Sequence, residues 1–131
     1  MGFRPLAFAL LAAGAFAVGS LARAADVQPY SASAFGAAEA AGRPILVDVY
    51  ADWCPTCRAQ APVIDRLTKS KKFDHLLVLR LNYDQQKNDW RALKVVRQST
   101  LIAFHGRRET GRVIAVTDPD GIEGLLETTG Q

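Results

Sequence analysis

The chain has 131 residues, of which 49% are hydrophobic and 22% charged, and this length allows one domain of ordinary size. Its formal net charge is +3, from 16 Lys and Arg against 13 Asp and Glu. The basic residues form no stripe interleaved with aromatic residues, so neither charge nor composition supports nucleic-acid binding.

The first 25 residues have the pattern of an export signal. A short positive start containing Arg4 precedes an almost wholly apolar, uncharged run over residues 6–21, and Ala22-Arg23-Ala24 supplies the small-x-small pattern of a signal peptidase site. The apolar run is shorter than the roughly 20 residues of a membrane-spanning helix. We therefore predict a signal peptide over residues 1–25, cleaved after Ala24 or Ala25, a periplasmic location and a single domain over residues 26–131. Without Arg4 and Arg23 the net charge falls from +3 to +1.

The domain is predicted to begin with an edge segment and a short helix. Residues 26–33 contain proline and serine and are typical of a tether or first edge strand. Ser33 is placed to cap an alanine-rich helix over residues 34–41, which Gly42 ends. Residues 45–50 follow as an almost continuous apolar run, rich in β-branched side chains, which indicates a strand buried on both faces.

Two further helices and a strand are predicted in the middle of the chain. One helix starts near Pro55 and runs to about residue 69, with Pro62 inside it as an expected kink. Its apolar residues Val63, Ile64 and Leu67 fit one face. Residues 76–81 form the next strand. Asp84 is then placed to cap a helix over residues 85–96, whose inner face carries Trp90, Leu93 and Val96.

The last third of the domain is predicted to be a hairpin and a helix. Residues 101–105 and 112–116 are strand-like and are separated by a glycine-containing connection. Asp118 and Pro119 start a final helix over residues 120–127. The order α-β-α-β-α-β-β-α predicts an α/β fold, in which a mixed central β-sheet is flanked by helices on both faces.

The two cysteines of the chain stand together as Cys54-Pro55-Thr56-Cys57. At the start of a helix, unpaired amides and the positive dipole end favour the thiolate of Cys54, which is the form that attacks disulfides. We expect Cys54 to be the exposed thiolate. Cys57 lies one turn further in, so we expect it to be shielded and to resolve the mixed disulfide by attacking Cys54. A bridge across two residues closes too small a loop to stabilise a fold much. The spacing therefore suits a bond that is made and broken.

A metal site through these cysteines is not predicted. His75 and His105 are the only histidines, and they lack the paired spacing of zinc ligands. We therefore expect no metal ligands within one chain.

The region around the cysteines resembles the thioredoxin family. Residues 45–58 resemble its active-site strand and loop, Pro62 falls at its helix kink, and residues 79–84 and 100–104 resemble its third and fourth strands. The match covers essentially all of residues 26–131. The resemblance implies a thioredoxin fold and an enzyme, a thiol–disulfide oxidoreductase of the protein disulfide reductase type, with no cofactor beyond the redox-active disulfide of Cys54 and Cys57.

Asp48 is an acid in the middle of an apolar strand. Burying a carboxylate is costly, so a buried Asp48 would mark a functional role, whereas in the alternative the strand is half exposed and Asp48 faces water. The resemblance implies that Asp48 lies behind Cys57 and relays protons to and from it. It also implies that Trp53 forms a wall of the site. The substrate-binding residues are then Trp53, Pro55, Thr56, Ser99 and Thr100.

Ser99 departs from the family, which usually has a cis-proline at this point. A non-proline cis bond costs about 2.5–4 kcal/mol, so the Gln98–Ser99 bond is either trans or a strained cis bond. This segment normally pairs with the substrate chain as an added strand, so the change bears on substrate choice more than on thiol chemistry. Loss of the proline ring also leaves room for an alternative function, in which Cys54 and Cys57 of two chains bind a metal or iron–sulfur cluster through four thiolates.

The resemblance also leads to an expected direction of electron flow. Asp48 and the lack of an inserted helical domain resemble reducing thioredoxins rather than dedicated disulfide-forming oxidants. We expect a monomer that acts on protein thiols and disulfides and is recharged by a membrane redox partner. The electrons would then serve cytochrome maturation or the repair of misoxidised proteins. A disulfide-forming oxidant stays open, because small differences in thiolate and disulfide stability set the potential.

Overall fold

The computed structural model describes residues 1–2 and 24–130. Nearly all of the predicted signal peptide, including its apolar run, lies outside the described residues, so its cleavage stays a prediction. Among the residues that are described, no helix is both long enough and apolar enough to cross a membrane.

The described part of the chain alternates between strands and helices. In chain order the elements are β1 (Asp26–Pro29), α1 (Ala32–Ala40), β2 (Pro44–Tyr50), α2 (Pro55–Thr68), the 3-10 turn η1 (Lys71–Phe73), β3 (Leu77–Asn82), α3 (Lys87–Ala92), β4 (Thr100–His105), β5 (Arg108–Ile114), α4 (Pro119–Glu127) and the 3-10 turn η2 (Thr128–Gly130).

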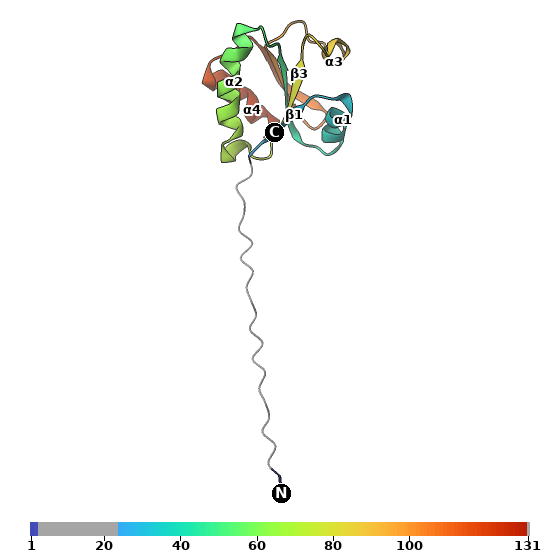
Figure 1. Ribbon diagram of the computed structural model, residues 1–131, viewed down its shortest axis with the longest axis vertical. Helices are drawn as coiled ribbons and strands as arrows, with labels where there is room; N and C mark the ends of the chain where they lie inside the picture. The colour runs from blue at the N-terminus through green and yellow to red at the C-terminus, as the bar shows by residue number, and fades with distance from the viewer. Residues whose placement is uncertain (3–23, 131) are drawn as a thin grey trace.

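The strands form one mixed sheet in the order β1-β3-β2-β4-β5. Strands β1, β3 and β2 run parallel, whereas β4 is antiparallel to β2 and β5 is antiparallel to β4. Helices α2 and α4 lie on one side of the sheet and α1 and α3 on the other (Figure 1). The predicted α/β architecture with helices on both faces is therefore confirmed.

Strand β2 is the centre of the molecule, and its side chains alternate between two cores. Val47 and Val49 pack with residues of α1 and with Trp90 of α3, whereas Leu46 packs with residues of α2 and α4. Because side chains alternate along a strand, Asp48 lies on the same face as Leu46, toward α2. The central strand thus carries one acid, and that acid faces the helix that begins at the cysteines.

The first helix begins two residues earlier than predicted. Ser31, and not Ser33, is the N-cap, because the Ser31 hydroxyl accepts a hydrogen bond from the amide of Ala34 at 3.0 Å. Gly42 follows the helix with a φ of +68°, a conformation that glycine adopts without strain.

Helix α3 is half as long as the helix predicted over residues 85–96. Its N-cap position is held by Gln86, and Asp84 does not cap it. Lys94 adopts a φ of +57° and breaks the helical path, so Val96 is 73% exposed and does not belong to an inner face. Trp90 does pack inward, stacked on Tyr83 with 4.6 Å between ring centroids.

The hairpin strand β5 was predicted too late in the chain. It begins at Arg108, directly after a short turn, although residues 108–112 are mostly polar. Its hydrogen bonds come from β4, and as an edge strand it exposes polar side chains to water. Ala115, with a φ of +57°, ends the strand before Val116. The final helix begins as predicted, with the Asp118 carboxylate accepting from the Gly121 amide at 2.7 Å.

Candidate active site

The two cysteines lie at the N-terminus of α2, just beyond the end of β2. Cys54 is the N-cap residue with an extended backbone, and Pro55 occupies the first helical turn, where its missing N–H costs nothing. The Cys54 Sγ accepts a hydrogen bond from the Cys57 amide at 3.1 Å. Both cysteines are free thiols in this structure. The cap geometry thus directs a helix amide at the first sulfur, as the sequence predicts.

Both cysteines are buried, which corrects the expectation that Cys54 is exposed and only Cys57 shielded. Cys54 is 1% exposed and Cys57 is 8% exposed. They pack against Ala51, with Tyr50 and Tyr83 alongside, and these residues come from the ends of β2 and β3. The different roles of the two thiols therefore rest on their helix positions and on the environment of Cys57 rather than on exposure.

The Cys57 thiol holds its proton firmly. Burial raises the pKa of Cys57 to about 11, and the neighbouring Cys54 side chain adds to the effect. The nearby backbone of Ala51 and of Ser99 offsets part of this rise. Cys57 is consequently protonated at neutral pH, and it needs a base before it can act as a nucleophile.

Asp48 is buried on the α2 side of the sheet, which excludes the alternative in which it faces water. Its Oδ2 lies 3.4 Å from the Nε of Arg80, its register partner on β3. Burial raises the pKa of Asp48 above its usual range, and the charge and hydrogen bond of Arg80 oppose that rise. The Arg80 guanidinium also stacks over the Tyr50 ring at 3.9 Å, which holds this half-exposed cation beside the acid.

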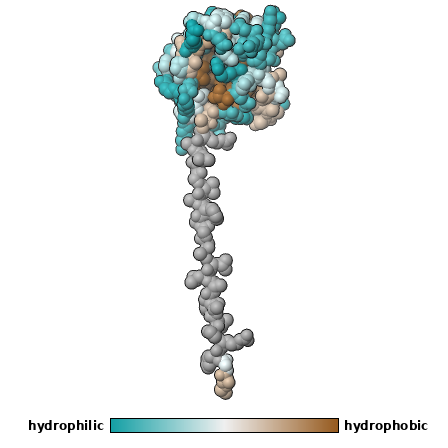
Figure 2. Space-filling model, in the orientation of Figure 1, coloured by the Kyte–Doolittle hydropathy of each residue, from teal (hydrophilic) through white to brown (hydrophobic). Residues whose placement is uncertain are grey.

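A pocket of about 240 Å³ connects Asp48 with the side of α2. Ala61 lines it, one helical turn beyond Cys57, together with Ile64 of α2 and Val27 of β1. Figure 2 shows hydrophobic residues gathered in a hollow on this face, where α2 meets the strands. Among the described residues no hydrogen bond joins Asp48 to Cys57, so the structure brings the acid to the correct helix without placing it in direct contact with the thiol.

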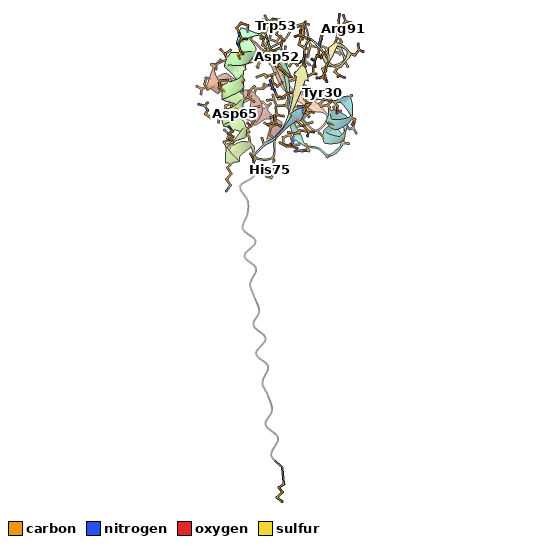
Figure 3. The ribbon with its side chains drawn as sticks, in the orientation of Figure 1. Tyr30, Asp52, Trp53, Asp65, His75 and Arg91 are labelled. Atoms are coloured by element: carbon orange, nitrogen blue, oxygen red, sulfur yellow. The ribbon has the colours of Figure 1, made fainter. Side chains whose placement is uncertain are left out.

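Trp53 is fixed over the active-site loop by a residue that sequence reasoning assigned elsewhere. Trp53 is 55% exposed, and its indole Nε1 donates to Asp84 Oδ2 at 2.9 Å. Figure 3 shows Asp52 and Trp53 at the end of the molecule opposite His75. Asp84 follows the carboxyl end of β3, which lies at the same edge of the sheet as the active-site loop, and this position was the signal available in the sequence. Beside Trp53, Pro55 is exposed and Thr56 is half-buried.

Ser99 adopts a left-handed backbone with a trans peptide bond before it. The described residues contain no cis peptide bond, and Ser99 has a φ of +59°. Its amide donates to the Val49 carbonyl at 2.8 Å, and its own carbonyl accepts from the Ala115 amide at 3.0 Å. The strained cis alternative is therefore not adopted.

The side chains of Ser99 and Thr100 are engaged within their own segment, and contact of this segment with substrates stays a prediction. Both residues are buried, and their hydroxyls donate to backbone carbonyls of their own segment, Ser99 to Gln98 at 2.6 Å and Thr100 to Arg97 at 2.7 Å. The exposed apolar residues beside them are Val96 and Ile114, which sequence reasoning placed in an inner helix face and an ordinary strand.

Gln60 is a second residue that sequence reasoning missed. It lies on α2 one turn beyond Cys57 and is 1% exposed, and its amide reaches the carbonyls of Ser99 and Val116. A polar residue three positions after Cys57 was the only hint in the sequence. Over the same described part of the chain, no group of three or more His, Cys, Asp and Glu side chains is placed to hold a metal ion.

Comparison with known proteins agrees with this geometry. The family model Thioredoxin matches residues 26–128. A thioredoxin of Alicyclobacillus acidocaldarius is 31% identical over 84 residues, which are 64% of this chain and 79% of that protein. A bifunctional thioredoxin reductase/thioredoxin of Mycobacterium leprae is 30% identical over 88 residues, 67% of this chain and 19% of that protein.

A solved structure shows the same fold. The crystal structure of Trxlp from Edwardsiella tarda EIB202 superposes with a TM-score of 0.75 at 40% identity, over 77% of this chain and 98% of that one. Thioredoxins act on protein disulfides through a redox-active disulfide and need no cofactor. The chain therefore belongs to the thioredoxin family, and it is a thiol–disulfide oxidoreductase whose reacting pair is Cys54 and Cys57.

Proposed function

We propose that this thioredoxin reduces disulfides of exported proteins in the periplasm and receives its electrons from a membrane carrier. The observation that carries the proposal is an export-type segment over residues 1–25 directly before a thioredoxin domain whose active site has a buried Asp48. The same site in the cytoplasm would need no such segment.

The reaction transfers two electrons from the cysteine pair to the partner. The Cys54 thiolate attacks one sulfur of the partner disulfide, forms a mixed disulfide and releases the first partner thiolate. Cys57 then loses its proton and attacks the Cys54 sulfur. This second step forms the Cys54–Cys57 disulfide and releases the second partner sulfur as a thiolate, which is protonated. The oxidised pair must be reduced again before the next cycle.

Asp48 acts as the proton acceptor for Cys57 in this scheme. Its buried position raises its pKa, so it can take up a proton that an ordinary surface carboxylate would not hold. The proton passes along the pocket that Asp48 shares with Ala61, one turn from Cys57. Arg80 at 3.4 Å keeps a positive charge beside the acid and assists return to the carboxylate form.

The electron donor is a dedicated redox partner. The Mycobacterium leprae relative combines thioredoxin reductase and thioredoxin in one protein, which supports a dedicated donor for this chain as well. In the periplasm that donor has to pass electrons across the membrane. The recipients are misoxidised exported proteins or apocytochromes awaiting haem.

Thiol trapping after cell fractionation tests the location and the direction together. The full chain, tagged at its C-terminus, is produced in a Gram-negative host, and thiols are blocked in intact cells with a membrane-permeable maleimide at neutral pH before the fractions are separated. We expect the periplasmic fraction to contain a form that lacks residues 1–24 or 1–25, with Cys54 and Cys57 reduced. A chain that starts at residue 26 is the control and should stay in the cytoplasm. Recovery of the uncleaved chain in the cytoplasm would contradict the location, and an oxidised periplasmic pair would contradict the direction.

The reduction potential separates the remaining alternatives. A reductant should equilibrate with glutathione near the thioredoxin value of about −270 mV, whereas a disulfide-forming oxidant should lie near about −120 mV. Anaerobic purification of a brown dimer with iron and sulfide would instead support the cluster-binding alternative.

A further inference from the structure

We propose that Gln60 is a positioning residue that clamps together the two loop segments beside the cysteines, and so shapes the surface to which protein substrates bind. The two segments are residues 97–100, which lead into β4, and residues 114–117, which begin at the last residue of β5; together they are called the rim. The proposal rests on thiol–disulfide exchange with proteins, and it does not depend on where in the cell the exchange takes place.

The Gln60 carboxamide joins three parts of the chain that are distant in sequence. Its Nε2 donates to the Val116 carbonyl at 2.9 Å and to the Ser99 carbonyl at 3.3 Å. These carbonyls lie 56 and 39 residues further along the chain. Gln60 itself lies one turn beyond Cys57 on α2 and is 1% exposed. One side chain therefore ties both rim segments to the helix that carries the cysteines.

The rim needs such a restraint because its backbone is strained. Ser99 and Ala115 have φ values of +59° and +57°, a region that residues with a Cβ disfavour. The two residues bond to each other through the Ala115 amide and the Ser99 carbonyl at 3.0 Å. Backbone of this kind persists only where the surroundings hold it in place. The Gln60 amide provides that support from α2, through its hydrogen bonds to the Ser99 and Val116 carbonyls.

The amide orientation of Gln60 is determined by its partners. A flipped amide would direct its oxygen at two carbonyl oxygens, so the donor side has to face the rim. Gln60 Oε1 is left as a buried atom without a hydrogen-bond partner in the described part of the chain. Ile64 and Leu67, the next buried residues along α2, belong to an apolar core, whereas Gln60 is polar. Its position is explained by the rim and not by that core.

The clamp acts on the parts of the site that a protein substrate meets. Ser99 lies close enough to Cys57 for its backbone to offset part of the rise in the Cys57 pKa. The exposed apolar residue Val96 directly precedes one rim segment, and the exposed Ile114 begins the other. If the rim relaxes, these residues move with it. A folded or extended protein chain covers that surface, whereas a small disulfide needs only access to the sulfur. Loss of the clamp should therefore weaken the binding of protein substrates more than that of small disulfides.

Gln60→Leu tests the proposal, because leucine fills a similar volume and donates nothing. Steady-state kinetics are measured with insulin and with the small aromatic disulfide DTNB, alongside thermal melting. We expect KM for insulin to rise about tenfold, the equivalent of one lost hydrogen bond of average strength, with a smaller change in kcat. The loss with DTNB should be smaller than the loss with insulin.

Thr129→Val is the matched control. Thr129 is also buried, but its hydroxyl bonds only to the nearby Leu126 carbonyl, and it lies by His105, at the end of β4 opposite Thr100. The Thr129→Val variant should lower the melting temperature but change the kinetics with insulin and with DTNB to the same extent.

A rescue experiment distinguishes the clamp from general stability. In the Gln60→Leu background, Ser99→Gly removes the Cβ that opposes a positive φ, so the rim should return toward its native path and KM for insulin should fall. Ser99→Ala keeps the Cβ and should not rescue. Equal losses with insulin and DTNB, an unchanged KM, or equal effects of glycine and alanine would each overturn the proposal. If Gln60→Leu does not fold, Gln60→Met replaces it. Failure of both to fold while Thr129→Val folds would show that Gln60 supports the core, and would overturn the proposal too.

Discussion

Replacing Ser99 with proline should destabilise this thioredoxin, although proline is what its family usually has at this position. Proline requires a φ near −65°, whereas Ser99 has a φ of +59°. Proline also lacks the N–H that Ser99 donates to the Val49 carbonyl at 2.8 Å. The segment must therefore change its backbone path to accept the ring.

The size of the loss follows from the hydrogen bonds involved. Leaving the buried Val49 carbonyl without a donor costs about 1–3 kcal/mol. Movement of the Ser99 carbonyl also weakens its bonds with Ala115 and Gln60, each worth about 0.5–1.5 kcal/mol. The total is about 2–6 kcal/mol, which for a domain of this size lowers the melting temperature on the order of 10 °C or more.

Thermal and urea denaturation of the purified protein measure this loss, with insulin reduction as the functional readout. Ser99→Ala is the control, because it keeps the amide and loses only the hydroxyl bond to the Gln98 carbonyl, for which we expect about 1 kcal/mol or less. A proline variant as stable and as active as the unaltered protein would refute the reasoning. Such a result would mean that the bond from the residue 99 amide to Val49 is not needed for the fold.

Four further predictions concern the acid and the thiols. Cys57→Ser should trap mixed disulfides with partner proteins on non-reducing gels and Cys54→Ser should not, and equal trapping by both variants would refute the assigned roles. Asp48→Asn should slow release of the reduced partner, and it should raise stability at neutral pH because it removes a buried charge while the half-exposed Arg80 can stay hydrated. Because burial raises the pKa of Asp48, its carboxyl group stays protonated in the folded protein at pH values where the unfolded chain has already lost that proton. The free energy of unfolding of the unaltered protein should therefore fall, relative to that of Asp48→Asn, as pH rises from about 4 through the folded pKa. Parallel curves of stability against pH for the two proteins would refute this. Ultraviolet thiolate absorbance of the reduced protein should show Cys57 ionising near pH 11, and full ionisation of both thiols at neutral pH would contradict its burial.

Local sequence determined the frame of the active site. The apolar, β-branched run of β2 and the proline after Cys54 placed the cysteines at a strand-to-helix junction, because both signals depend on neighbouring residues alone. The same holds for Asp118 at the start of α4. The acid in β2 is also conspicuous from the sequence alone, because a charge inside an apolar strand is costly wherever the strand lies.

Contacts between distant parts of the chain decided the rest. Cys54 is buried because the ends of β2 and β3 meet over it. Asp84 accepts the hydrogen bond of the Trp53 indole because the fold brings the end of β3 beside the active-site loop. Strand β5 extends over polar residues because β4 supplies its hydrogen bonds. The left-handed backbone of Ser99 depends on donors and acceptors from β2, from the end of β5 and from Gln60. A sequence pattern records the preference of each residue for its neighbours along the chain, whereas these conformations are stabilised by hydrogen bonds and packing that exist only once the sheet has formed.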